Sequence, residues 1–143
     1  MRARLVLGLA LGLALGCGSG QKFAPVSGKV TLDGQPLAGA TVSLQPIAPE
    51  GSAEAGPGSA GKTNEKGEYT LTGDKGQKGA LVGKHRVVIT CLRQQAGDGD
   101  ARPPRGGWPL ADKVPARYNS SSHETFEVPA GGTDKADFNL SSK

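Results

Sequence analysis

The chain has 143 residues, of which 17 are basic and 13 acidic, and its formal net charge is +4 at neutral pH. The basic residues are scattered, and the only aromatic residues are three Phe, two Tyr and one Trp. A nucleic-acid-binding surface needs basic residues grouped in a stripe and, for single strands, aromatic side chains among them. We therefore expect no nucleic-acid partner, and the length suits one small domain.

The first sixteen residues have the layout of a secretory signal peptide. Arg2 and Arg4 give a positively charged start, an apolar run follows over residues 5–15, and Gly16 stands before the expected cut. The run is too short for a transmembrane helix, which needs roughly 20 apolar residues. We expect residues 1–16 to be removed on export, which leaves 15 basic and 13 acidic residues.

The end of this run, Leu13-Ala14-Leu15-Gly16-Cys17, resembles the lipobox of bacterial lipoproteins, with Ala14 and Leu15 in swapped order. The resemblance implies that Cys17 becomes a lipidated N-terminus on the periplasmic or outer surface of an envelope membrane. Two or more acyl chains, such as palmitate, anchor a protein stably. An ordinary signal peptide with an unmodified Cys17 is the alternative. Residues 17–25 would form a tether reaching less than about 30 Å.

After the signal peptide, apolar residues alternate with a period of two, which predicts strands, and no window keeps the 3.6-residue period of a helix. Residues 26–32 form the first strand, which ends at the turn dipeptide Asp33-Gly34. Residues 40–45 form the next, and these two are the clearest pair of half-buried strands. Residues 48–61 lack periodicity and are expected to be a mobile loop.

The middle of the chain contains a predicted hairpin and the most apolar strand. Residues 63–69 place a turn between two short extended pieces, with Tyr69 and Leu71 on the same side. Residues 83–92 bring apolar side chains together without alternation, which indicates a central strand. Cys91 at its end is expected to be a buried structural thiol.

The last third contains an irregular stretch and two closing strands. Residues 94–112 are rich in Gly and Pro around Trp108, and strands follow at 125–128 and 136–140. About seven strands without helices predict an all-β fold, an antiparallel two-sheet β-sandwich of transthyretin-like or Ig-like type. The domain is expected to cover residues 26–143.

Three segments of this pattern resemble the carboxypeptidase regulatory-like domains, which have a transthyretin-like (prealbumin-like) sandwich. They are residues 26–44 (VSGKVTLDGQPLAGATVSL), 63–71 (TNEKGEYTL) and 83–89 (GKHRVVI). Residues 114–118 (VPARY) and the final hairpin, 128–140, are similar to small lipoproteins of planctomycete bacteria. The resemblance implies the fold, but it implies no particular activity, because such folds host many functions.

Enzymatic and metal chemistry are both poorly supported. The superfold includes the hydroxyisourate hydrolases, which use several histidines, an arginine and a Tyr-Arg-Gly-Ser tail, whereas this chain has two histidines and ends in Leu-Ser-Ser-Lys. No hydrolase elbow, His-Glu-x-x-His motif or paired-cysteine spacing occurs. A metal site would have to draw on His85, His123, Asp98, Asp100 and Glu124, whose spacing matches no known ligand set. We expect no enzyme, no cofactor and no metal.

Two other groups of residues suggest chemistry and are given a structural interpretation. Residues 120–124 contain Ser, His and Glu, but neighbours on an extended chain point to alternate faces and cannot form a triad. Lys29 and Asn139 stand where some related sandwiches form an internal isopeptide bond. Both are out of phase with the apolar residues of their strands, so we expect them to face solvent.

Two hypotheses of function remain. The first is a non-catalytic, membrane-anchored envelope lipoprotein that acts as a structural or protein-interaction module and presents loops 48–61 and 94–112 to another envelope protein. The second is a carbohydrate- or peptide-binding module that uses Trp108 and Tyr118 as stacking contacts. Sugar-binding sandwiches show two or three exposed aromatic residues on one face, so we favour the first hypothesis.

Overall fold

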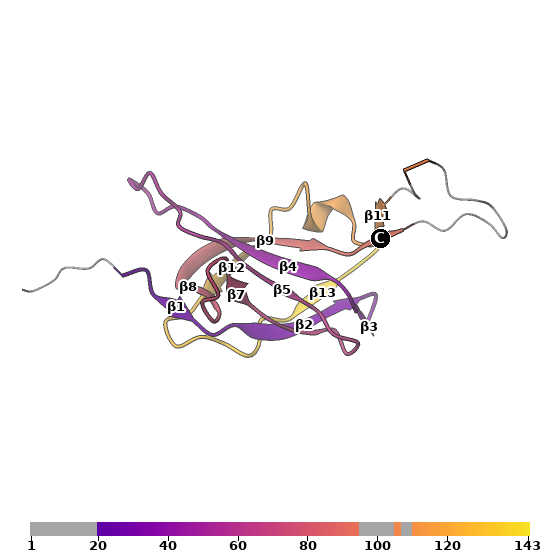
Figure 1. Ribbon diagram of the computed structural model, residues 1–143, viewed down its shortest axis with the longest axis horizontal. Helices are drawn as coiled ribbons and strands as arrows, with labels where there is room; N and C mark the ends of the chain where they lie inside the picture. The colour runs from indigo at the N-terminus through magenta and orange to yellow at the C-terminus, as the bar shows by residue number, and fades with distance from the viewer. Residues whose placement is uncertain (1–19, 95–104, 107–109) are drawn as a thin grey trace, which may run out of the picture.

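The computed structural model describes residues 20–94, 105–106 and 110–143. The predictions on residues 1–16, Cys17 and Trp108 concern residues outside these ranges. The described chain is a β-sandwich with one short 3-10 helix, which confirms the predicted all-β class (Figure 1). The elements are β1 (Phe23–Ala24), β2 (Ser27–Leu32), β3 (Gln35–Pro36), β4 (Thr41–Pro46), β5 (Ser59–Lys62), β6 (Glu68–Thr70), β7 (Thr72–Gly73), β8 (Ala80–Leu81), β9 (Gly83–Thr90), β10 (Leu92–Gln94), β11 (Leu110–Asp112), η1 (Ala116–Tyr118), β12 (Thr125–Val128) and β13 (Phe138–Leu140).

Two sheets make up the sandwich. The larger has the strand order β12-β9-β4-β5-β7, and the smaller has the order β13-β2-β3, with β6 also paired to β2. The pairs are antiparallel apart from β13, which lies parallel to β2. The chain leaves β12 at the end where β2 begins and crosses to the other sheet there, so β13 must run in the same direction as β2 (Figure 1).

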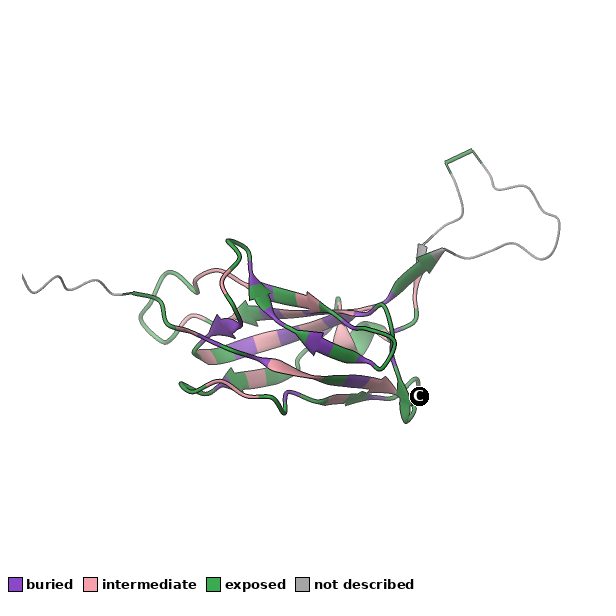
Figure 2. Ribbon diagram, turned by 60° about the horizontal axis from the view of Figure 1, so that its bottom comes forward, coloured by how far each residue is buried: buried purple, intermediate pink, exposed green. Residues whose placement is uncertain are grey.

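The core lies between the sheets and is built from every second residue of the long strands (Figure 2). Val30 of β2, Val42 and Leu44 of β4 and Ile89 of β9 are each at most 1% exposed. Burying such a side chain fully stabilises the fold by about 1.5 to 3 kcal/mol. The period-2 pattern of the sequence therefore identified the faces that meet.

The two strands that were expected as a pair lie in different sheets. β2 ends at the predicted turn, Asp33-Gly34, but its antiparallel neighbours are β3 and β6, whereas β4 pairs with β5 and β9. The chain crosses between the sheets at Leu37 and Ala40, which are buried. Thr63 fixes this crossing, because its hydroxyl donates to the Leu37 carbonyl (2.6 Å) and accepts from the Ala40 N–H (2.8 Å).

Part of the expected loop at 48–61 is a strand. β5 begins at Ser59 and pairs with both β4 and β7. Its residues are Ser, Ala, Gly and Lys, so it has no apolar alternation by which a pattern could reveal it. The strand forms through backbone pairing to its neighbours.

The predicted hairpin at 63–69 is correct in its turn and wrong in its pairing. The N–H of Asn64 donates to the Glu68 carbonyl at 2.9 Å, so the chain reverses there. The strands on either side belong to different sheets, because β5 pairs with β4 and β6 pairs with β2. Tyr69 and Leu71 are buried on the same side, as predicted.

The strand predicted to be central is central. β9 lies between β12 and β4. Its burial nevertheless alternates, since Val87, Ile89 and the free thiol of Cys91 are buried while Val88 is half-buried. A strand in a two-layer sandwich has one face on the core, so Val88 packs outside it.

The sandwich has two distinct ends, at which the chain departs from the expected boundaries. At the end where the chain enters, β1 pairs with β8, so strand pairing begins before the first expected strand at Val26 (Figure 1). At the other end, β10 pairs with β11 inside the stretch 94–112 that was expected to be irregular. No helix in the described part of the chain is long and apolar enough to cross a membrane.

Candidate functional site

A groove of about 330 Å³ opens beside η1. Val87 and Ile89 of β9, each 1% exposed, supply apolar contacts together with Phe138 and Leu140 of β13. Glu124, Asp137 and Asn139 add polar groups that are exposed to solvent. Small ligand sites are lined mostly by apolar groups with a few polar ones, whereas the exposed lining of this groove is more polar than apolar. Its volume is at the lower limit for such sites. The remaining lining residue is Tyr118.

Tyr118 is held in place by the C-terminal tail and by its own neighbour. Its hydroxyl accepts a hydrogen bond from the N–H of Ser141 (3.2 Å), and the Arg117 guanidinium lies 5.0 Å from the centre of its ring. Arg117 and then the Ser141 N–H hold the pKa of Tyr118 below its usual value. Arg117 also donates to the carbonyls of Ser141 and Lys143. Because Arg117 covers one face of the ring, Tyr118 can offer a ligand its other face or its edge.

Asp112 positions η1 through three hydrogen bonds. Its Oδ1 accepts from the N–H groups of Cys91 and Val114, both at 2.8 Å, and its Oδ2 accepts from Nδ2 of Asn119 at 3.1 Å. One carboxylate therefore joins the end of β9, the start of the η1 segment and the residue after Tyr118. Asp112 is a positioning residue for the groove, since the groove does not contact it.

The Ser-His-Glu letters at 120–124 are not a catalytic triad. Ser122 is buried, and its hydroxyl donates to the Val87 carbonyl at 2.5 Å. The same hydroxyl accepts from the N–H of Glu124 at 3.3 Å, and His123 faces solvent. Ser122 thus binds the edge of β9 just before β12 begins, which agrees with the structural interpretation made from the sequence.

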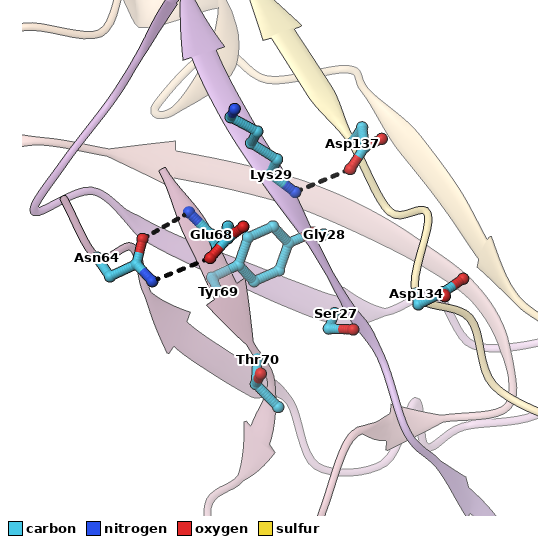
Figure 3. Close-up of a pocket in the computed structure, with 9 residues that line it drawn as sticks. All are labelled: Ser27, Gly28, Lys29, Asn64, Glu68, Tyr69, Thr70, Asp134 and Asp137. Atoms are coloured by element: carbon cyan, nitrogen blue, oxygen red, sulfur yellow. Dashed lines mark hydrogen bonds between the residues drawn. The ribbon is translucent and has the colours of Figure 1, made fainter. Parts of the chain in front are cut away.

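A second hollow, of about 410 Å³, lies on the outer face of β2 and β6 (Figure 3). Its acidic residues are Glu68, Asp134 and Asp137, with Lys29 beside them. Asp137 accepts from the backbone N–H of Lys29 (2.9 Å), and Glu68 accepts from the Asn64 amide (3.3 Å). Glu68 therefore supports the turn and Asp137 the contact between β2 and the segment before β13, and no hydrogen bond joins the Ser27 or Thr70 hydroxyl of this hollow to a carboxylate.

Tyr69 connects β6 to the segment before β13. Its ring is 3% exposed, and its hydroxyl donates to the Ala136 carbonyl at 2.5 Å. Burial, with a contribution from the charge of Asp137, raises the pKa of Tyr69 far above its usual value of 10. Gly28 lies opposite Tyr69, and a Cβ there would come within 2.0 Å of the same carbonyl. The absence of a side chain at residue 28 is what allows this close approach.

The two histidines lie in different surroundings. His85 is 1% exposed, with Nε2 at 2.7 Å from the Leu81 carbonyl, and its Nδ1 has no hydrogen-bond partner within the described residues. His123 is exposed. The side chain of His85 points into the sandwich like those of Val87 and Ile89. Among the described residues, no group of three His, Cys, Asp or Glu side chains is placed to hold a metal ion.

Lys29 and Asn139 face solvent, as predicted. Oδ1 of Asn139 accepts a hydrogen bond from the Thr31 hydroxyl at 2.8 Å. Lys29 donates a hydrogen bond from its backbone N–H to Asp137. An isopeptide bond requires its lysine, amide and acid to be buried together, and these exposed positions do not provide that environment.

The candidate residues have three outcomes. Tyr118 lines the groove, and its role as a ligand contact stays a prediction. Cys17 and Trp108 lie outside the described residues. The groove also involves Phe138 and Asp112, and neither was singled out as a candidate from the sequence. Asp112 accepts a hydrogen bond from the N–H of Val114, two residues later, as Asp does in a common type of turn. That turn preference of Asp is the one signal for Asp112 in the sequence.

Comparisons with known proteins identify no relatives. No family model matches the chain, and neither a curated protein nor a solved structure is significantly similar to it.

Proposed function

We propose that this protein is a non-catalytic lipoprotein, anchored through Cys17 to an envelope membrane, whose sandwich serves as a protein-interaction module. The observation that carries the proposal is how early the chain joins the domain. The carbonyl of Lys22 accepts from the Val82 N–H at 2.9 Å, and β1 follows at once. Only four residues separate Cys17 from Lys22. Fully extended, this segment spans about 18 Å, so a lipidated Cys17 would hold the sandwich against the membrane.

The end opposite the anchor supports an interaction role. The β10–β11 pair extends from the sandwich beyond the two main sheets (Figure 2). Leu92 on β10 is 59% exposed, the highest value among the large apolar side chains of the described residues. A two-stranded ribbon is only marginally stable by itself, and an exposed apolar side chain on such a ribbon suits contact with a partner. An anchor at one end would direct this arm away from the membrane.

The polar groups of the described sites support a non-catalytic role. Ser122, Glu68, Asp112 and Asp137 are each engaged in hydrogen bonds that hold the backbone. The resemblance to carboxypeptidase regulatory-like domains is part of the same proposal, because it concerns a sandwich with no fixed chemistry.

The anchor is tested by removing one cysteine at a time. We expect wild-type protein from native membranes to have an intact mass that starts at residue 17 with acyl chains, and to partition into detergent. Cys17→Ala should be found in the soluble fraction. Cys91→Ala is the matched control, because Cys91 is 4% exposed inside the domain, and it should stay in the membrane fraction. A soluble, unacylated wild-type protein would refute the proposal.

A ligand-binding role is the second candidate, and the groove at Tyr118 is the observation that favours it. A single sugar ring or one apolar peptide side chain fits its volume of about 330 Å³. The test is an NMR titration with monosaccharides and short peptides, comparing wild type with Tyr118→Ala. Chemical-shift changes at Ile89 and Phe138 that disappear in the variant would support this role, and unchanged spectra would exclude it for the ligands used.

A further inference from the structure

The end at which the chain enters the domain has an apolar surface of its own. A hollow of about 260 Å³ is lined there by Lys22, Ile47, Val82 and Lys84, among others. Ile47 is 42% exposed and Val82 is 36% exposed, and they are two of the three exposed large apolar side chains in the described chain. We call these four residues the entry face.

The backbone holds the entry face in a fixed arrangement. The N–H of Ile47 donates to the Lys84 carbonyl, and the N–H of Val82 donates to the Lys22 carbonyl, both at 2.9 Å. Each apolar residue is therefore tied to a lysine on a neighbouring segment. The exposed side chains of Ile47 and Val82 therefore line the same hollow, and the backbone does not have to rearrange to bring them together.

We infer that the entry face is the surface with which the domain rests on the membrane. In this arrangement Ile47 and Val82 contact the boundary between headgroups and acyl chains, and Lys22 and Lys84 lie near lipid phosphates. The inference rests on the proposed lipid anchor, because it uses the position of Cys17, which only four residues separate from Lys22. A tether of about 18 Å leaves this end of the sandwich no room to turn away from the bilayer.

The charge around the entry face indicates which force dominates. Lys22 and Lys84 favour anionic lipid, but Glu50 and Glu54 lie on the adjoining loop and oppose it. Attraction of basic residues to a membrane surface is therefore largely offset here. We expect apolar contact to dominate, with weak dependence on salt. Two partly exposed side chains are too few to bind a membrane without the lipid, so the entry face orients a domain that the acyl chains hold.

The experiment places a fluorescent reporter at each end of the full-length acylated protein. The parent carries Cys91→Ala, and a single new thiol is introduced as Ile47→Cys on the entry face or as Gln35→Cys at the opposite end. The thiol is labelled with an environment-sensitive nitrobenzoxadiazole maleimide. The protein is then reconstituted into phosphatidylethanolamine–phosphatidylglycerol vesicles, with and without brominated acyl chains. The parent without a new thiol reports whether Cys17 is blocked.

We expect the label at residue 47 to shift its emission to shorter wavelength and to be quenched by brominated lipid, with neither change at residue 35. Adding Val82→Ser to the Ile47→Cys protein should reduce the quenching. Equal signals at both positions, with Cys17 blocked, would overturn the inference and leave the anchor intact. A label at 47 that is shielded in native membranes but exposed in pure vesicles would assign the entry face to a protein partner and overturn it as well. A parent that takes up label at Cys17 would refute the anchor itself.

Discussion

At the end where the chain enters, backbone packs against backbone, whereas at the end that carries η1 and the β10–β11 arm, side chains hold the chain in place. Gly79 shows the first case, since a Cβ there would lie 1.8 Å from the Ala24 carbonyl oxygen. Asp112 and Arg117 show the second, through their hydrogen bonds to η1 and to the C-terminal tail. At Gly79 there is no space for a side chain, whereas at the second end individual side chains make the contacts that hold η1 and the tail.

This difference suits the two roles proposed for the ends. A surface that rests on a membrane next to a covalent anchor has to keep its shape. Close contacts between main-chain atoms favour this, because they do not depend on side chains that can change rotamer. A surface that meets a protein partner benefits from elements with lower local stability, which can adjust on binding. Four substitutions test whether the two ends differ in this way.

The largest effect is expected from Gly79→Ala at the entry end. The methyl group would overlap the Ala24 carbonyl, and the residue has φ +90°, which L side chains rarely adopt. We expect a loss of about 3 to 4 kcal/mol in the free energy of unfolding, measured by urea denaturation followed by circular dichroism.

Gly76→Ala is the control for this prediction. Gly76 has a similar φ of +81° in the same turn region, but nothing lies within 4 Å of its would-be Cβ. Its substitution should cost about 1 to 2 kcal/mol, because only the backbone strain remains. If the two variants were equally stable, the close approach to Ala24 would not be what holds this end.

The next effect is expected from Asp112→Ala at the far end. The substitution leaves the N–H groups of Cys91 and Val114 without their acceptor, which should cost about 2 to 3 kcal/mol. Hydrogen exchange should speed up at Val114 and through η1 while β4 stays protected. Asp112→Asn is the control, because it retains an acceptor oxygen, and it should lose less than half as much. Uniform acceleration across all strands would contradict the idea of a locally held end.

Tyr69→Phe removes the link between β6 and the segment before β13 and is expected to cost about 1 to 2 kcal/mol, because the buried Ala136 carbonyl loses its donor. It also changes the dependence of stability on pH. The pKa of Tyr69 is higher in the folded state than its usual value of 10, which applies to the unfolded chain. The neutral tyrosine therefore contributes its full share to the free energy of unfolding below pH 10, and this contribution is lost as the pH rises from 10 toward the folded-state pKa. Wild type should therefore destabilise above pH 10 more steeply than Tyr69→Phe. Parallel curves would show that Tyr69 ionises freely.

The sequence predicted those parts of the fold that depend on side-chain periodicity. β2, β4 and β12 have clear apolar faces, and the structure contains all three, with β12 at the predicted bounds of 125–128. β9 was predicted from its continuous apolar run instead. β5 could not be predicted, because its Ser-Ala-Gly-Lys sequence has no apolar face and its pairing comes from its neighbours. The crossing at Leu37–Ala40, which separates β2 from β4, depends on Thr63, 23 residues after Ala40. Such contacts between distant residues leave no local pattern.

The candidate site was predictable to a smaller extent. Tyr118 attracts attention as one of two tyrosines, and it does line the groove. Phe138 alternates with Leu140 along its strand, which predicts a core position. The alternation does not show that a groove opens beside Phe138. Asp112 acts through three backbone and amide groups that only the fold brings together.

The smallest change in stability is expected from Leu92→Ser on the β10–β11 arm. Leu92 is 59% exposed, so the free energy of unfolding should change by less than about 0.5 kcal/mol.

If the arm meets a partner, a photo-crosslinking residue at position 92 should give a discrete adduct in native membranes, and the same residue at the exposed Gln45 should not. Wild type with an affinity tag should retain the protein identified in that adduct, and Leu92→Ser should retain less of it. No adduct from position 92, or equal adducts from both positions, would remove the arm from the proposed function, since an exposed leucine that contacts nothing specific is ordinary surface.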